Sequence, residues 1–341
     1  MDKTIFITPL PAFYKVNLYN EIAKRKDISA WFLGNETIEN RSSDFVSTEM
    51  NFDHCFINTG SFQNRNKIRS SFKLTKKLII QNPIEVIIGG WDTVEFWMVI
   101  LLLNKNKVSL VLESSVLESK TKGIKGFLKK VFLRKVSKVY ASGNSHVKLL
   151  KNLNFKGEII VTKGVGLINY SQKTKPLEKY QGNFLYVGRL SKVKNLIFLI
   201  NVFNMLPNHK LTIIGTGPDE DNLKSISENN INFLGSINNN ELPKYFSNNN
   251  FLILPSYSEP WGLVVEEALY NGVPVIISKN CGSLDLIENN INGYVFNPFR
   301  QQELFDILNN ITDEKYQFLK SNIAIDFIEQ KDNKQVNSYL D

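Results

Sequence analysis

Cysteine and histidine are scarce in this sequence, whose 341 residues include two cysteines and three histidines. Cys55 and Cys281 lie far apart, and His54, His146 and His209 have no metal-ligand spacing. The sequence therefore predicts neither a disulfide framework nor a zinc site. Because low cysteine content is typical of proteins in a reducing compartment, we expect a cytoplasmic location.

Long apolar runs are also lacking. The longest, Phe96 to Leu103, is far shorter than the ~20 residues that a membrane-spanning helix needs. The first residues lead directly into a strand-like segment, so we expect no signal peptide. The composition, 43% apolar and 22% charged, is that of a globular protein, and the length predicts two domains of roughly 150 residues each.

Positive charge is concentrated in the first half. Residues 1–170 contain 26 Lys and Arg against 14 Asp and Glu, a net charge of +12, whereas residues 171–341 contain 15 against 19, a net charge of −4. Two segments, Arg65 to Lys77 and Lys120 to Lys138, supply much of this excess. The second interleaves its lysines with apolar residues: Phe127, Leu128, Val131, Phe132 and Leu133.

This second segment has two interpretations. Its apolar side chains pack on a neighbouring sheet, or the helix rests on an anionic membrane surface at the inner face of the plasma membrane. We favour the first for the apolar face and keep the second for the charge. Neither basic segment has the interleaved surface aromatics of a nucleic-acid-binding module, so no nucleic-acid partner is expected.

Apolar, β-branched segments alternate with segments of helical period, which predicts an α/β fold of two Rossmann-like, doubly wound parallel-sheet domains facing across a cleft. Strands are expected at Thr4–Pro9, Ser29–Leu33, His54–Ile57, Val86–Gly90, Ser109–Glu113, Lys138–Ala141, Ile159–Thr162, Phe184–Val187, Leu211–Ile214, Asn232–Leu234, Phe251–Leu254 and Val273–Ile277. Helices are expected at Val16–Arg25, Lys73–Gln81, Gly123–Val136, Leu196–Met205, Asp219–Glu228, Glu241–Ser247, Trp261–Tyr270 and Gln302–Asn310.

Domain boundaries follow from a break in this alternation. The stretch 169–183 is polar, contains a proline and a glycine, and is the expected linker. It separates an N-terminal domain, 1–168, from a C-terminal domain, 184–318. A C-terminal helical segment, 319–341, is expected to pack back on the N-terminal domain.

The stretch SEPWGLVVEEALYNGVPVI, residues 258–276, carries the first candidate site. It follows an expected buried strand, so Glu259 lies in a loop at a strand's carboxyl end. The amides of Trp261, Gly262 and Leu263 begin the next helix, where unpaired N–H groups and the helix dipole favour an anion such as a phosphate. Glu259 is placed to bind sugar hydroxyls, and Glu267 to accept hydrogen bonds from a ribose. By itself this pair is also explained by a helix N-terminal charge and a surface glutamate.

The whole string resembles the signature of glycosyltransferase family 4, retaining sugar transferases of the GT-B fold, in which E-x(7)-E is followed by A-x(3)-G-x-P-V. The residues that match are Glu259, Gly262, Glu267, Ala268, Gly272, Pro274 and Val275. The resemblance implies donor contacts from Pro260, Trp261, Gly262 and Leu263. It also assigns acceptor binding to the first domain and nucleotide-sugar binding to the second.

Further segments match the family in the expected order. LYVGRLSKVKNL resembles its G-R-L-x(3)-K-N segment, in which the arginine and lysine bind the donor diphosphate; here these are Arg189 and Lys194, after Gly188. Two cations at a strand end suit two adjacent phosphates, and arginine can bind oxygens in a bidentate way. A charge pair at a helix start is the alternative. The other implied donor contacts are Gly215 and Gly217 in IIGTGP, and Leu234 and Ile237 at the base-binding strand end FLGSI.

The first half is similar to the family only in architecture. The segment after the first strand resembles the family's acceptor-contacting loop, which implies Tyr14 and Lys15; a helix-entry turn with a hydrophobic staple is the alternative. Many family members carry a histidine at a strand end of this domain, and no histidine here has such a place. The expected position is occupied by LESS, so Glu113 or Ser114 is the candidate for that contact with the donor sugar.

The resemblance implies a retaining, metal-independent hexosyltransferase without a cofactor. Its co-substrate is a nucleotide diphosphate sugar, with UDP favoured and GDP next. The basic first domain favours a lipid-linked saccharide of bacterial surface-polysaccharide synthesis as acceptor, and a soluble saccharide or a protein stays open. The alternatives on the same scaffold are a nucleotide-sugar epimerase, a phosphorylase, and a non-catalytic sugar-nucleotide-binding subunit.

Overall fold

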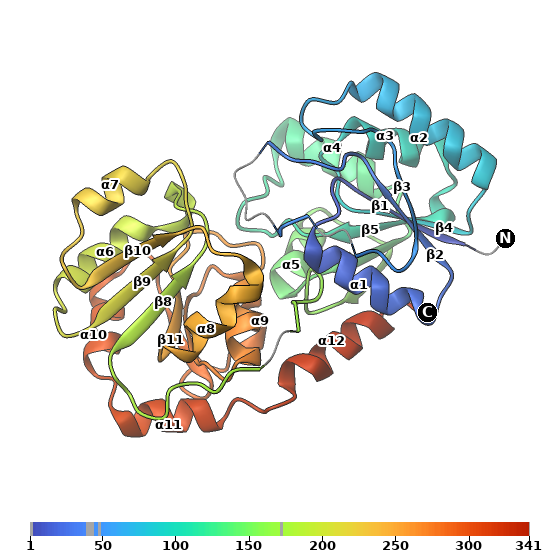
Figure 1. Ribbon diagram of the computed structural model, residues 1–341. Helices are drawn as coiled ribbons and strands as arrows, with labels where there is room; N and C mark the ends of the chain where they lie inside the picture. The colour runs from blue at the N-terminus through green and yellow to red at the C-terminus, as the bar shows by residue number, and fades with distance from the viewer. Residues whose placement is uncertain (1–2, 39–43, 47–48, 171–172, 341) are drawn as a thin grey trace. The chain divides into compact units, whose positions relative to one another are not determined.

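The computed structural model describes residues 3–38, 44–46, 49–170 and 173–340. Contacts divide the chain into two compact units (Figure 1). The first contains the described residues up to 38, those of Asp44–Leu167, and those from Asp332 onward, and the second contains Ile168–Lys331. Ser171 and Gln172 of the expected linker lie outside the described residues.

The first unit is built on a seven-stranded sheet with the order β3-β2-β1-β4-β5-β6-β7. Its strands are β1 (Thr4–Thr8), β2 (Ile28–Phe32), β3 (Asp53–Phe56), β4 (Glu85–Ile88), β5 (Val108–Leu112), β6 (Lys138–Ala141) and β7 (Glu158–Val161). All neighbouring strands are parallel. The strand order reverses between β1 and β4, which makes this pair the switch point of a doubly wound sheet.

Helices cover both faces of this sheet. On one face lie α2 (Lys67–Gln81), α3 (Val94–Leu102), α4 (Gly123–Leu133) and α5 (Asn144–Asn152). They bury Leu74, Phe96, Phe132 and Leu149 against that face, and α2, α3 and α4 are drawn together over the sheet in Figure 1. The opposite face is covered by α1 (Phe13–Ala23) and by Tyr339, whose ring stacks on Tyr140 with 4.3 Å between centroids.

The second unit has a six-stranded parallel sheet in the order β10-β9-β8-β11-β12-β13. Its strands are β8 (Asn183–Val187), β9 (Lys210–Ile214), β10 (Ile231–Gly235), β11 (Phe251–Leu254), β12 (Val275–Ser278) and β13 (Gly293–Phe296). The order again reverses beside its first strand, so β8 and β11 form the switch point. The predicted fold class of two doubly wound parallel sheets is confirmed.

Seven helices accompany this sheet in the sequence: α6 (Leu196–Asn204), α7 (Glu220–Ser225), α8 (Leu242–Ser247), α9 (Leu263–Tyr270), α10 (Gln301–Asn309), α11 (Asp313–Ser321) and α12 (Phe327–Asn337). The last of them contains a boundary of the two units, because Lys331 belongs to the second unit and Asp332 to the first.

Several predicted boundaries were wrong. α1 begins at Phe13 instead of Val16, which puts Tyr14 and Lys15 in its first turn. α2 begins six residues early, at Lys67, because the Asn66 side chain accepts a hydrogen bond from the Arg69 amide and caps the helix. β13 was missed, because its four residues carry the weak, glycine-led pattern GYVF.

The start of α9 was also wrong, and this error bears on the site. The helix begins at Leu263, two residues after the predicted Trp261, since Gly262 has a φ of +91° and cannot continue a right-handed helix. Glu267 is therefore one turn into the helix.

The α4 segment divides between its two interpretations. Phe132 and Leu133 are buried against the sheet, as in the first interpretation. Phe127 and Ile124, however, are 63% and 81% exposed among the lysines of the same segment. In the part of the chain that the structure describes, no helix has both the length and the apolar character needed to cross a membrane.

Replacing Tyr339 tests how far the C-terminal residues stabilise the first unit. Tyr339→Ala removes a ring that is 2% exposed and stacked on Tyr140, and losing a buried aromatic costs ~3–5 kcal/mol. We expect a clearly lower melting temperature by differential scanning calorimetry. The control Ile325→Ala, at a side chain that is 84% exposed, should change stability by no more than about 0.5 kcal/mol. Equal melting temperatures for the two variants would contradict this role.

Candidate functional site

The sequence-predicted donor residues gather at the carboxyl ends of the second unit's strands, where doubly wound sheets bind ligands. Gly188 and Arg189 follow β8, Gly215 follows β9, and Leu234 ends β10. Glu259 follows β11, which neighbours β8 at the switch point. Segments far apart in the sequence thus meet at one edge, called the donor edge below.

Lys194 and Glu259 form an ion pair at this edge. Lys194 ends a short 3-10 turn after β8, and Glu259 lies in the loop after β11. Their side chains are 16% and 12% exposed, so the pair is largely screened from water yet open on one side. The two strands of the switch point therefore bring a cation that can bind phosphate and a carboxylate that can bind hydroxyls to the same place.

The groups around Glu259 remain neutral. Burial and the nearby Glu259 carboxylate raise the pKa of the Cys281 thiol to about 12 and hold the pKa of the Tyr186 hydroxyl well above its usual value. The Tyr186 hydroxyl donates to the Arg189 carbonyl oxygen at 3.0 Å. Glu259 and Lys194 are consequently the charged pair at the centre of the donor edge, and the Arg189 side chain is exposed beside them.

Asn195 fixes the loops that carry this pair. Its side-chain amide is buried and donates to the carbonyl oxygens of Pro255 at 3.1 Å and Pro298 at 3.0 Å. The Tyr257 amide in turn donates to the Val193 carbonyl at 2.9 Å. These bonds join the loops after β8, β11 and β13, so the residue next to Lys194 determines where the Glu259 loop lies.

Glycines bring two loops of the donor edge into direct contact. A Cβ on Gly215 would lie 1.9 Å from the Gly188 carbonyl oxygen, and one on Gly217 would lie 2.2 Å from that of Leu190. The Leu190 amide donates to the Thr216 carbonyl at 2.9 Å. Only residues without a side chain permit this approach, and it positions the Arg189 segment.

The loop of residues 259–262 extends the sheet before α9 begins. The Glu259 amide donates to the Asn280 carbonyl at 3.0 Å, and the Glu259 carbonyl accepts from the Gly282 amide at 2.8 Å. Gly282 is required because a Cβ there would lie 1.8 Å from the Pro260 carbonyl oxygen.

The helix N-terminus that follows is available to an anion. Within the described residues, the amides of Leu263 and Val264 donate no backbone hydrogen bond. Trp261, by contrast, is only 2% exposed and its indole points inward to Glu266. The anion-binding groups are thus the amides of the first helical turn, and the Trp261 side chain supports them from the interior.

Glu267 lines a small cavity of about 10 Å³ with Asn239 and Leu242, which follow β10. Leu234 is 36% exposed at the end of β10, and Ile237 is partly buried beyond it. The predicted ribose and base contacts therefore lie in neighbouring segments of one unit.

The first-unit candidates form a separate cluster. The Lys15 ammonium lies 2.7 Å from a Glu113 carboxylate oxygen and donates to the Thr8 hydroxyl at 3.1 Å. Lys15 is buried; burial lowers its pKa and the Glu113 carboxylate raises it, with a net upward shift. His146, which the sequence places within a helix, lies with its Nε2 3.2 Å from the Glu113 carbonyl oxygen. Lys15 and Glu113 are thus partners at the carboxyl ends of β1 and β5, and Tyr14 lies beside them with its ring 5.9 Å from the Lys15 ammonium.

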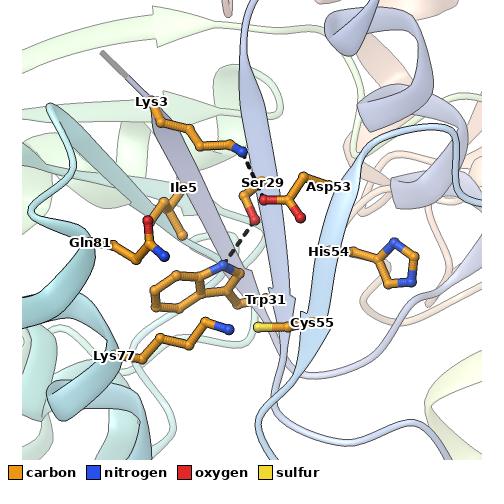
Figure 2. Close-up of a pocket in the computed structure, with 9 residues that line it drawn as sticks. All are labelled: Lys3, Ile5, Ser29, Trp31, Asp53, His54, Cys55, Lys77 and Gln81. Carbon is orange, nitrogen blue, oxygen red and sulfur yellow. Dashed lines mark hydrogen bonds and ion pairs between the residues drawn. The ribbon is translucent and has the colours of Figure 1, made fainter. Parts of the chain in front are cut away.

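A cavity of about 120 Å³ elsewhere in the first unit is not part of this cluster (Figure 2). Lys3, Ser29 and Asp53, which line it, lie at the amino ends of β1, β2 and β3. Its charges are paired internally, with Lys3 and Asp53 2.7 Å apart. The cavity is at the opposite edge of the sheet from the cluster around Lys15.

The segment Asp219-Glu220-Asp221 matches a D-x-D pattern, which many metal-dependent sugar transferases use. Glu220 forms an ion pair with Lys224 at 2.7 Å. Throughout the described ranges, no group of three or more His, Cys, Asp and Glu side chains is arranged as a metal site.

Sequence reasoning missed Asn195, Cys281 and Glu266 as parts of the donor edge. Asn195 could have been found, because it belongs to the matched G-R-L-x(3)-K-N segment. Cys281 and Glu266 act through long-range contacts to Trp261, for which the sequence carries no local signal.

Comparison with known proteins identifies the fold class. The structure matches that of Anabaena HepE in complex with UDP and glucose with a TM-score of 0.76 and 17% identity, over 100% of this chain and 99% of HepE. Together with two Rossmann-like units and a donor edge at a switch point, this match defines a GT-B fold.

The family follows from the second unit. Residues 170–326 match the family model described as glycosyl transferases group 1 and belong to that family. An uncharacterized 41.2 kDa protein of the cps region of Klebsiella pneumoniae is 32% identical over 48% of this chain and 46% of its own length. The O-antigen biosynthesis glycosyltransferase WbnH of Escherichia coli is 30% identical over 44% of this chain and 43% of its length. The chain spans less than half the length of these curated relatives.

Two glycine variants test the close contact of the loops at the donor edge. Gly215→Ala places a Cβ 1.9 Å from the Gly188 carbonyl, so the loop that carries Arg189 must move. Gly235→Ala is the matched control, because Gly235 also has a positive φ but no atom within 4 Å of its Cβ position. We expect Gly235→Ala to cost about 1 kcal/mol, and Gly215→Ala to cost more and to weaken nucleotide binding at least tenfold in calorimetric titration. Equal behaviour of the two variants would argue against the contact.

Proposed function

We propose that the chain is a retaining glycosyltransferase of family 4, which transfers a sugar from a nucleotide diphosphate sugar to a saccharide. The observation that carries this proposal is the Lys194–Glu259 pair at the switch point of a group 1 domain, beside the N-terminus of α9. Cation, carboxylate and free amides are the groups that a diphosphate and a sugar require.

Each donor-edge group has a defined role in this proposal. Arg189, Lys194 and the first amides of α9 bind the diphosphate and stabilise the charge that develops on it, which is electrostatic catalysis by preorganised donors. Glu259 binds sugar hydroxyls and Glu267 binds the ribose.

The transfer occurs on one face of the sugar. The bond between the anomeric carbon and the phosphate oxygen breaks, and the acceptor oxygen bonds to the same face of that carbon. The acceptor proton passes to the leaving diphosphate. The product therefore keeps the anomeric configuration of the donor, and neither a cofactor nor a metal takes part.

UDP is the favoured nucleotide and GDP the next. The HepE structure is a complex with UDP and glucose, and its fold match covers nearly the whole of both chains, which supports testing UDP first. In the first unit, the Lys15–Glu113 pair and Tyr14 are the proposed contacts for the acceptor and the donor sugar.

The proposed acceptor is a lipid-linked saccharide of surface-polysaccharide synthesis. The relatives in a cps region and in O-antigen biosynthesis support this class. The outer surfaces of α2 and α4 also support it: no acidic residue occurs in either helix, and Phe72 and Phe127 are 68% and 63% exposed among their lysines. Basic residues with exposed apolar side chains favour an anionic membrane surface.

Nucleotide binding is tested with UDP, GDP, ADP and TDP in thermal-shift assays with EDTA present. Binding to the folded state raises the melting temperature by mass action, and we expect the largest rise for UDP. Glu267→Ala and Arg189→Ala should reduce the rise, whereas Glu228→Ala, at an exposed residue after α7, should keep it. If no diphosphate stabilises the wild type at millimolar concentration, the chain is not a nucleotide-sugar transferase, and a non-catalytic subunit becomes the better description.

Membrane binding is tested by sedimentation with vesicles. We expect the protein to bind vesicles that contain phosphatidylglycerol but not vesicles of phosphatidylcholine alone, and high salt to weaken the binding. Phe72→Ser combined with Phe127→Ser should reduce binding at least tenfold. Phe318→Ser, at a 51% exposed residue of α11, is the control and should bind like the wild type. Undiminished binding of the double variant would contradict a role for α2 and α4.

A further inference from the structure

A buried chain of polar contacts lies behind the donor edge. The Trp261 indole N–H donates to one carboxylate oxygen of Glu266 at 2.5 Å. The other oxygen accepts from the Lys331 ammonium at 2.7 Å. Trp261, Glu266 and Lys331 are 2%, 0% and 5% exposed. The ion pair thus joins α12, near the end of the chain, to α9 at the donor edge.

This arrangement is costly by itself. Removing two charges from water opposes folding, and apolar residues of similar volume often stabilise a protein as well as a buried ion pair does. Leaving one charge without its partner costs far more, about 3–5 kcal/mol. What the pair supplies is a fixed geometry, because each oxygen of Glu266 has one directional partner.

The residue that receives this geometry is Trp261, which directly precedes the N-cap of α9. Its carbonyl oxygen accepts from the Ser283 amide at 2.9 Å and from the Cys281 thiol at 3.1 Å. With the indole held by Glu266, both ends of Trp261 are fixed. The direction in which the amides of Leu263 and Val264 point therefore depends on Trp261.

We propose that Lys331 is a positioning residue for the donor site, which acts through Glu266 and Trp261 on the amides that bind the diphosphate. The proposal rests on the function proposed above and identifies a residue beyond 326, where the match to the family ends. Lys331 itself does not touch the donor.

Three variants test this role. Glu266→Gln combined with Lys331→Met leaves no unpaired charge, and the amide oxygen of Gln can still accept from the indole, so the protein should fold; only the link to α12 is lost. Lys331→Arg keeps the charge and a donor. Trp261→Phe removes the indole N–H.

Two measurements read out these variants. We expect the dissociation constant for UDP, measured by calorimetric titration, to rise at least tenfold in the double variant and in Trp261→Phe, and less than threefold in Lys331→Arg. We also expect hydrogen exchange of the segment 259–265 to become faster in the double variant.

The outcomes are distinct. A double variant that melts earlier but binds UDP like the wild type, with unchanged exchange in 259–265, would overturn the proposal and leave a structural ion pair. A wild type that binds no nucleotide diphosphate would overturn the proposed function; hydrogen exchange would then still decide whether Lys331 fixes this segment, and unchanged exchange would reject that as well.

Discussion

The donor edge depends on one buried side-chain amide, that of Asn195. Parallel strands end at a common edge, and the loops beyond them have left the hydrogen-bonded ladder that aligns the strands. Pro255 and Pro298 lie in two of these loops, and each has a carbonyl oxygen but no N–H group. The Asn195 amide donates to both carbonyls and so joins the loops after β8, β11 and β13. Lys194 can meet Glu259 only because its neighbour sets this spacing.

Sequence reasoning recovered the strands and the donor residues for the same physical reason. A strand buried on both faces needs a continuous apolar run, and Phe251–Leu254 and its counterparts carry that signal locally. The residues after such runs must lie at the carboxyl edge, so Arg189, Lys194 and Glu259 could be brought together without coordinates. The order of strands then decides which of these residues are neighbours.

What the sequence could not predict depends on long-range pairing or on single backbone angles. The positive φ of Gly262 delays the start of α9 and turns Trp261 inward, whereas the helical period of the segment runs through both residues. Glu266 reads as an ordinary helix charge until its partner, Lys331, is known to lie 2.7 Å away. Lys15 and Glu113 were each assigned a separate substrate contact, yet they form one pair. A polar residue in a buried position cannot be interpreted from its neighbours in sequence.

The buried ion pairs of both units follow one rule of placement. Lys194–Glu259, Lys15–Glu113 and Arg65–Glu95 all join segments that follow the carboxyl ends of strands, and the last pair is bidentate at 2.7 and 2.9 Å. If such pairs served mainly to stabilise the fold, the apolar layers of the sheets would do so at lower desolvation cost. Their concentration at the edges where backbone pairing ends indicates another role, the fixing of loops that have no ladder of their own. At the donor edge, the Lys194–Glu259 pair also opens to solvent on one side, so the same interaction that orders the loops presents two opposite charges to a ligand.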